Sequence, residues 1–151
     1  MQTSFRLSVL ALLLAASGAA SAQPNRSATP GTTLTVSSDA VAQAAVQAGG
    51  ADRVAVQGSG CSGYIANASP AAAVEWSGSG PLSIYATSGT DTTLLISDPS
   101  GRWHCSDDAN GSNPGVTIAR AAAGRYLVWV GSYDPASSPA TLKAKGGQPA
   151  W

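Results

Sequence analysis

The sequence has little charge and no basic cluster. Lys, Arg, Asp and Glu make up 11% of the 151 residues, and the formal net charge is +0. Proteins that bind nucleic acids neutralise phosphates with clustered Lys and Arg, and anionic membranes attract polybasic runs. Because the chain has neither pattern, we expect that it binds neither nucleic acids nor anionic lipid membranes.

Signatures of catalysis and of zinc binding are also missing. His104 is the only histidine, and no G-x-S-x-G element accompanies it, although Asp107 is near enough in sequence to orient its ring. In an alternating strand His104 lies on the face opposite Trp103, where we expect it to be exposed. Cys61 and Cys105 are isolated rather than arranged as C-x-x-C, which argues against zinc. We therefore expect a protein that is not an enzyme.

The longest apolar run is too short for a membrane span. It reads LSVLALLLAA, whereas crossing a bilayer takes about 20 apolar residues. Arg6 precedes the run, and the small residues Ala20, Ser21 and Ala22 follow it, as in a secretory signal peptide that is cleaved before Gln23. An uncleaved N-terminal anchor is the alternative. We predict a signal peptide over residues 1–22 and a secreted or periplasmic protein that does not insert into the membrane after cleavage.

The two cysteines form an even pair in a chain that we expect to be exported. Such pairs are typical of disulfides, because oxidising compartments preserve the bond. We predict a Cys61–Cys105 bridge. On the chain-entropy model, closing a loop of this length stabilises the fold by roughly 4 kcal/mol.

Most of the chain consists of short runs in which apolar and polar residues alternate, separated by turn sequences such as SDPSG and DDANGSNPG. This pattern predicts an all-β fold, an antiparallel β-sandwich or jelly roll of about 7–9 strands, with a closed barrel as the alternative. We expect a flexible lead-in over 23–36, the sandwich over 37–145 and a tail over 146–151. The run 126–130 is apolar on both faces and should be central, whereas 140–145 places lysines on one face like an edge strand.

Residues 39–48 permit two interpretations. Their Ala and Gln content, with Asp39 as N-cap and Gly49 as C-cap, favours a helix by propensity. Propensity is a weak guide, because packing overrides it, so a strand remains open.

Carboxylate and amide side chains gather in one turn-rich segment and just before a neighbouring strand. Hard oxygen ligands converging from a flexible loop are what Ca²⁺ requires. The candidate calcium ligands are Asp91, Asp107, Asp108, Asn110 and Asn113, and Asp98 is a further candidate. The competing interpretation is turn chemistry, in which Asp and Asn hydrogen-bond the backbone.

Aromatic residues form a second candidate site. Trp103, Trp129 and Tyr133 are candidates for a platform that stacks on sugar or peptide. Aromatics in a β-sandwich also fill the core or cover a disulfide, and that alternative stays open.

Several motifs together resemble a known family. They are Asp91-Thr92-Thr93-Leu94, Pro99-x-Gly101-x-Trp103-x-Cys105-x-Asp107-Asp108, Asn113-Pro114 and Gly124-x-Tyr126-x-x-Trp129-Val130-Gly131. In this order and spacing they resemble bacterial pre-peptidase C-terminal domains, in a short, stand-alone exported form. The resemblance implies a β-sandwich without catalytic residues and a strand over residues 43–48. One departure is Ser69-Pro70-Ala71, where that family tends to have an acid.

The resemblance and the composition together imply an exported, non-catalytic accessory or interaction domain, with calcium as a candidate stabilising ion. The expected partner is a protein or a polysaccharide outside the cytoplasm. The alternatives are a peptidase-associated or hydrolytic protein and a carbohydrate-binding module.

Overall fold

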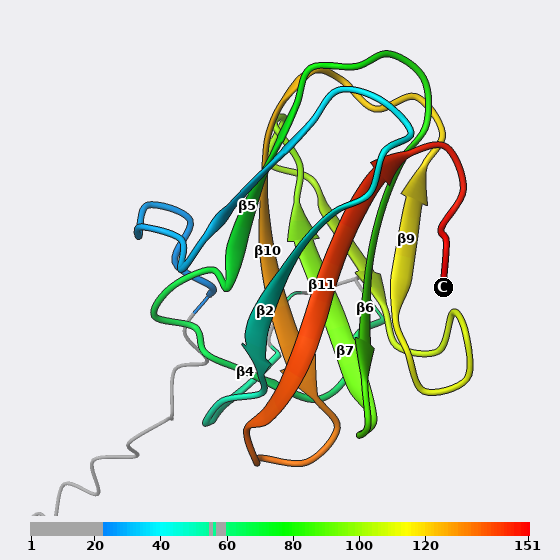
Figure 1. Cartoon of the computed structure of the whole chain (residues 1–151). Coiled ribbons are helices and arrows are strands. Elements are labelled where there is room, and N and C mark those ends of the chain that lie inside the picture. Colours follow the sequence, from blue (N-terminus) through cyan, green and yellow to red (C-terminus); the bar gives the residue numbers. More distant parts are fainter. Residues whose placement is uncertain (1–22, 55, 57–59) are drawn as a thin grey trace, which may run out of the picture.

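The computed structural model describes residues 23–54, 56 and 60–151, and the signal peptide predicted over 1–22 lies outside them. The described residues form eleven strands and no helix. The strands are β1 (Thr33–Val36), β2 (Ala42–Ala48), β3 (Asp52–Arg53), β4 (Tyr64–Ile65), β5 (Ala72–Trp76), β6 (Leu82–Ser88), β7 (Thr92–Ser97), β8 (Trp103–Ser106), β9 (Gly115–Ile118), β10 (Gly124–Ser132) and β11 (Ser138–Gly146). They build two sheets that lie face to face, which confirms the predicted β-sandwich (Figure 1).

The larger sheet has seven strands and is organised around β10. β5 pairs with its first half, β7 pairs along its second half, and β4 pairs at Ser132. β8 lies beyond β7, and β3 lies beyond β4. β10 is therefore central, as its two apolar faces predict.

The smaller sheet has the order β2-β11-β6-β9, and all its pairs are antiparallel. β11 thus lies between two strands, so the expectation of an edge strand over 140–145 is wrong. Lys143 and Lys145 point to the outer face, where long alkyl stems lie along the sheet and the charged heads reach water. The Lys143 ammonium lies 5.8 Å from the centre of the Tyr85 ring. Lysines therefore mark the solvent face of an interior strand here.

The hydrophobic core fills the space between the sheets. Alternate residues of β5, β6, β7, β10 and β11 face inward, because side chains on a strand point to opposite faces in turn. Leu82, Ile84, Leu94, Ile96 and Leu142 have no exposed surface. Burying a side chain of this size contributes about 1.5–3 kcal/mol, so this layer supplies most of the driving force for folding.

Two sequence-based boundaries and the expected number of strands need correction. Residues 33–36, expected in a flexible lead-in, form β1, which pairs with β5 in parallel and buries Leu34 and Val36 in the core. The sandwich is therefore not purely antiparallel, and it starts before residue 37. The eleven strands exceed the expected 7–9 because β1 and the two-residue β3 and β4 were not foreseen. At the other end, β11 extends to Gly146, and Trp151 packs on Tyr85 with ring centres 5.0 Å apart.

Residues 39–48, by contrast, contain the strand β2, so the helix alternative is wrong. Ala44, Val46 and Ala48 turn toward the core, and Gln43, Ala45 and Gln47 turn outward. Pairing with β11 along the whole strand outweighs the helix propensity of alanine.

The predicted disulfide is confirmed. Cys61 and Cys105 are bonded, with their Cα atoms 5.8 Å apart, and the bridge ties the segment before β4 to β8. Next to it lies a second, smaller hydrophobic cluster on the outer face of the seven-stranded sheet, centred on Ile65, Leu95 and Trp129. The bridge therefore fastens the chain over the face of the sheet that the main core does not use.

Candidate functional site

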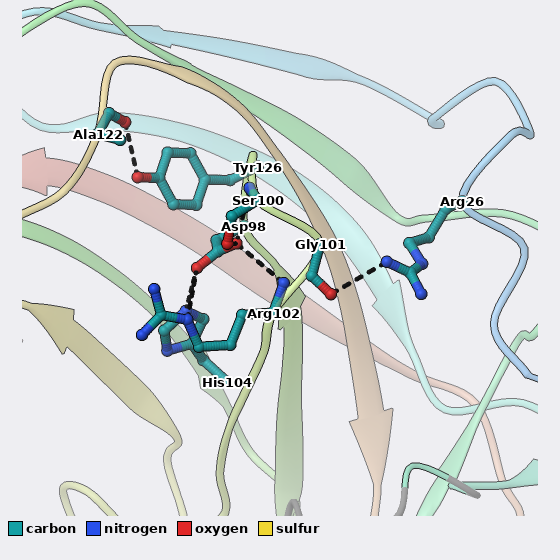
Figure 2. Close-up of polar contacts among 8 residues, drawn as sticks. All are labelled: Arg26, Asp98, Ser100, Gly101, Arg102, His104, Ala122 and Tyr126. Atoms are coloured by element: carbon teal, nitrogen blue, oxygen red, sulfur yellow. Dashed lines mark hydrogen bonds and ion pairs between the residues drawn. The ribbon is translucent and has the colours of Figure 1, made fainter.

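Asp98, in the turn between β7 and β8, makes polar contacts through both of its carboxylate oxygens. Its Oδ1 accepts hydrogen bonds from the Ser100 N–H at 2.9 Å, the Ser100 Oγ at 2.6 Å and the Arg102 N–H at 3.0 Å. Gly101, with φ +83°, supplies the left-handed residue that closes this turn. The segment Asp98-Pro99-Ser100-Gly101 thus forms a tight turn around one carboxylate oxygen (Figure 2).

The second oxygen of Asp98 faces the side chains of His104 and Arg102. Oδ2 lies 2.9 Å from His104 Nε2 and 3.5 Å from Arg102 Nε. Because an ionised carboxylate only accepts hydrogen bonds, the imidazole nitrogen Nε2 carries the proton in this contact. The Asp98 side chain is 10% exposed and the His104 side chain 20%, while Arg102 is 74% exposed. His104 was expected to be exposed, but the contact with Asp98 holds it partly buried.

These contacts determine the charge of Asp98. Partial burial by itself raises the pKa of a carboxyl group. Hydrogen bonds from the Ser100 hydroxyl, from His104 and from the main-chain N–H groups of Arg102 and Ser100 outweigh burial and lower the pKa of Asp98 to about 2. Asp98 is therefore ionised at every physiological pH.

A cavity of about 260 Å³ lies beside this turn, at one end of the sandwich. Its lining combines the polar residues Asp98, Arg102, His104 and Arg120 with apolar groups that include the Tyr126 ring. The Tyr126 hydroxyl donates to the Ala122 carbonyl at 2.7 Å, and burial together with the nearby Asp98 charge raises its pKa. The cavity is smaller than the roughly 300–1,000 Å³ typical of small-molecule sites.

The arrangement does not match that of a serine hydrolase. In such enzymes the histidine lies between the carboxylate and the serine, so that it takes the hydroxyl proton. Here Ser100 and His104 both donate to the same carboxylate, so the serine proton is directed to Asp98. Asp107, the carboxylate proposed from sequence to orient His104, instead accepts from the hydroxyls of Thr93 and Ser62.

Three of the five candidate calcium ligands lie together. Asp91, Asp107 and Asp108 line a cavity of about 100 Å³ with Ser62, Thr92, Thr93 and Tyr133. Slight burial and the carboxylates of Asp108, Asp107 and Asp134 raise the pKa of Asp91. Within the described part of the chain, the one group of three or more His, Cys, Asp or Glu residues with ligand atoms within 4.8 Å of one another is Cys61, Cys105 and Asp107. The disulfide uses both sulfurs of this group.

The remaining candidate ligands lie elsewhere. Asn110 and Asn113 pair with each other across a small turn, and Asn113 Oδ1 accepts from the Ser88 N–H at 2.9 Å. Asn113 thus uses its side chain on the main chain of β6, and Asn110 contributes main-chain groups to the turn. Asp98 follows β7 whereas Asp91 precedes it, so a six-residue strand of roughly 20 Å separates them. Asp98 therefore cannot share a metal ion with Asp91.

The three candidate platform aromatics do not form one surface. Trp129 is 1% exposed and packs on Trp103 with ring centres 5.5 Å apart. Trp103 is half-buried, and the Arg26 guanidinium covers it at 4.8 Å from the ring centre. Tyr133 is 62% exposed but lines the acidic cavity instead. Trp103 and Trp129 thus belong to the cluster beside the disulfide, so the expected platform is corrected to a packing role for both.

Sequence reasoning missed the pairing of Asp98 with His104 and the arginines next to it. The signal was present in the hairpin. With Ser97 opposite Trp103 and Ile96 opposite His104, the turn residue Asp98 comes within reach of His104. Arg26 was missed because it lies in the lead-in expected over 23–36, yet its guanidinium donates to the Gly101 carbonyl at 3.1 Å (Figure 2).

No protein-family model matches the chain, and no curated protein matches it. The part of the chain that the structure describes holds no helix of the length and apolarity needed to cross a membrane. Among solved structures, a periplasmic inhibitor of g-type lysozyme from Aeromonas hydrophila matches with 14% identity and a TM-score of 0.42, over 75% of this chain and 94% of that one. The pre-peptidase C-terminal domain of a collagenase from Bacillus anthracis matches with 15% identity and a TM-score of 0.47, over 78% of this chain and 99% of that one. The latter is a domain of the kind that the sequence motifs resemble.

Proposed function

We propose that this chain is an exported, non-catalytic binding module, an accessory or interaction domain whose partner is a protein or polysaccharide outside the cytoplasm. The observation that carries the proposal is the arrangement around Asp98. The hydroxyl of Ser100 and the ring of His104, the only histidine, both donate to the Asp98 carboxylate, which is ionised at physiological pH, so neither activates the other. This arrangement stabilises a turn rather than supplying a nucleophile.

The disulfide supports the exported location. Structural disulfides persist in oxidising compartments and are rare where glutathione keeps thiols reduced. The Cys61–Cys105 bridge is half-buried against Trp103 and Trp129, as expected of a structural bond rather than a redox-active one.

The dimensions of the cavity beside Asp98 support binding of a larger partner. About 260 Å³ accommodates one side chain or one sugar ring rather than a whole small substrate. Arg102 and Arg120 at its rim would favour an acidic group on that partner.

The test for catalysis compares the purified protein with its Ser100→Ala and His104→Ala variants on generic protein and ester substrates. We expect all three to equal the blank, while thermal unfolding shows that each is folded. Hydrolysis by the wild type that disappears in His104→Ala would overturn the proposal. The test for export is the mass of the protein recovered from the periplasm or medium, which should correspond to a chain that starts at Gln23.

Calcium stabilisation is a second, separate proposal, favoured by the three carboxylates of the 100 Å³ cavity. Exposed Asp91 and Asp108 would have to turn toward Asp107 to share an ion. Free calcium at about a hundred times its dissociation constant would stabilise the fold by roughly 2.7 kcal/mol. We expect calcium to raise the melting temperature of the wild type but not of Asp108→Asn, with Asp39→Asn as the matched control. Equal melting temperatures in calcium and in chelator would eliminate this proposal.

A further inference from the structure

Strand β2 forms one edge of the four-stranded sheet. One side of it pairs with β11 over its whole length, and no other described strand pairs with it. Because alternate residues of an edge strand direct their N–H and C=O groups outward, β2 presents a row of main-chain donors and acceptors to the surroundings. In Figure 1 this edge runs down the side of the front layer.

This edge lacks the usual protection against pairing. Edge strands are commonly kept short or carry a charge, a proline or a bulge. β2 has seven residues, AQAAVQA, and none of these devices. The opposite edge of the same sheet is different, because the C-terminal Trp151 lies against Gly115 of β9 and against Tyr85.

The sequence of β2 is almost a palindrome about Ala45. An antiparallel copy centred there would place Ala42 opposite Ala48, Gln43 opposite Gln47 and Ala45 opposite itself, leaving Ala44 and Val46 as the one unlike pair. Symmetric dimers require such a self-complementary patch. The outward face would carry two Gln–Gln pairs whose amides can bond across strands, and the inward face would carry only small apolar side chains.

We propose that β2 pairs with β2 of a second copy of this chain, antiparallel and centred on Ala45, so that two four-stranded sheets become one continuous sheet. Charge permits this contact. A groove of about 270 Å³ runs along the edge beside Ala45, Val46 and Gln47, and none of its lining residues is charged. Two copies therefore meet without the like-charge repulsion that symmetry imposes on any charged patch.

The expected dimer is weak. The contact consists of one pair of edge strands with about six main-chain hydrogen bonds. It buries less accessible surface than the roughly 1,200 Å² at the lower limit of stable interfaces. Val41, immediately before β2 and 44% exposed, adds apolar surface at each end of the contact. We therefore expect dissociation in the micromolar range and a dimer fraction that rises with protein concentration.

The test is sedimentation of the full chain, as exported, over a series of concentrations. Ala45 is exposed, so Ala45→Lys should fold normally but place two ammonium groups opposite each other and raise the dissociation constant at least about tenfold. The matched control is Ala119→Lys, an exposed position just after β9 at the other edge of the same sheet. We expect the control to dimerise like the wild type.

Cross-linking tests the register without relying on a charged variant. Opposed residues of antiparallel strands have Cα atoms about 4.5–5.5 Å apart, which a disulfide can bridge. Mild oxidation should therefore link Ala45→Cys to itself, whereas Gln43→Cys, whose counterpart lies about 13 Å away, should stay unlinked. A chain that is monomeric at every concentration, or a dimer that Ala45→Lys leaves intact, would overturn the proposal.

Discussion

Replacing Asp98 by asparagine removes the charge at the centre of the β7–β8 turn with almost no change in volume. In the folded chain the pKa of Asp98 is about 2, against an ordinary 3.8. One pKa unit corresponds to about 1.4 kcal/mol, so the ionised carboxylate stabilises the fold by roughly 2 kcal/mol at neutral pH. Since the pKa is lowered on folding, this stabilisation is complete above about pH 4 and is lost as the pH falls through 2.

Urea denaturation of the wild type and of Asp98→Asn from pH 7 to pH 2 measures this contribution. We expect the difference in free energy of unfolding to be about 2 kcal/mol at pH 7 and to fall to a small fraction of that at pH 2, where half of the folded wild-type carboxylates and nearly all of the unfolded ones are protonated. Asp39→Asn, which removes an exposed carboxylate, is the control and should follow the wild type. A difference that stays constant over this range would refute the reasoning, because the loss would then not arise from the charge.

Four further substitutions and one double variant test the packing and the bridge. Cys61→Ala should lower the free energy of unfolding by about 4 kcal/mol for a sequence separation of 44, and adding Cys105→Ala should cost little more because both changes break one bond. Trp129→Ala should cost about 3–5 kcal/mol, and Tyr133→Ala within about 0.5 kcal/mol, by the same denaturation assay. Gly131→Ala should cost about 1–3 kcal/mol, since its Cβ would lie 2.7 Å from a main-chain oxygen of β4. Equal losses for Trp129→Ala and Tyr133→Ala would contradict the burial described above.

Alternation of apolar residues was sufficient to predict most strands. Each sheet has one face on the core, so every second residue of its strands is apolar, and this period is visible in the sequence. It failed at β1, where only Leu34 and Val36 alternate inside a stretch rich in Pro and Gly. It also failed for β11, because the lysines show which face meets water but not whether the strand has one neighbour or two. Neighbour relations in a sheet depend on distant segments, which local pattern does not contain.

The candidate sites also depend on contacts between distant segments, which the local sequence pattern does not contain. The acidic residues Asp91, Asp107 and Asp108 line one cavity, because turns at the same end of adjacent strands bring them together. Asp98 was grouped with them although it lies at the other end of β7. Its partner His104 follows from hairpin register, which the turn length determines and composition does not. Trp129 was misassigned because an aromatic side chain has the same sequence signature in a cluster as on a surface.

The Cys61–Cys105 bridge has a mechanical consequence. The ring that it closes runs from before β4 to β8 and so contains β6 of one sheet and β5 and β7 of the other. If the chain is pulled by its two ends, β1 and β11 can peel away, but the ring cannot lengthen. With 44 residues held back, the chain under tension should extend roughly 150 Å less than its reduced form. Both layers of the sandwich thus remain linked under a force that strips the first and last strands of the chain.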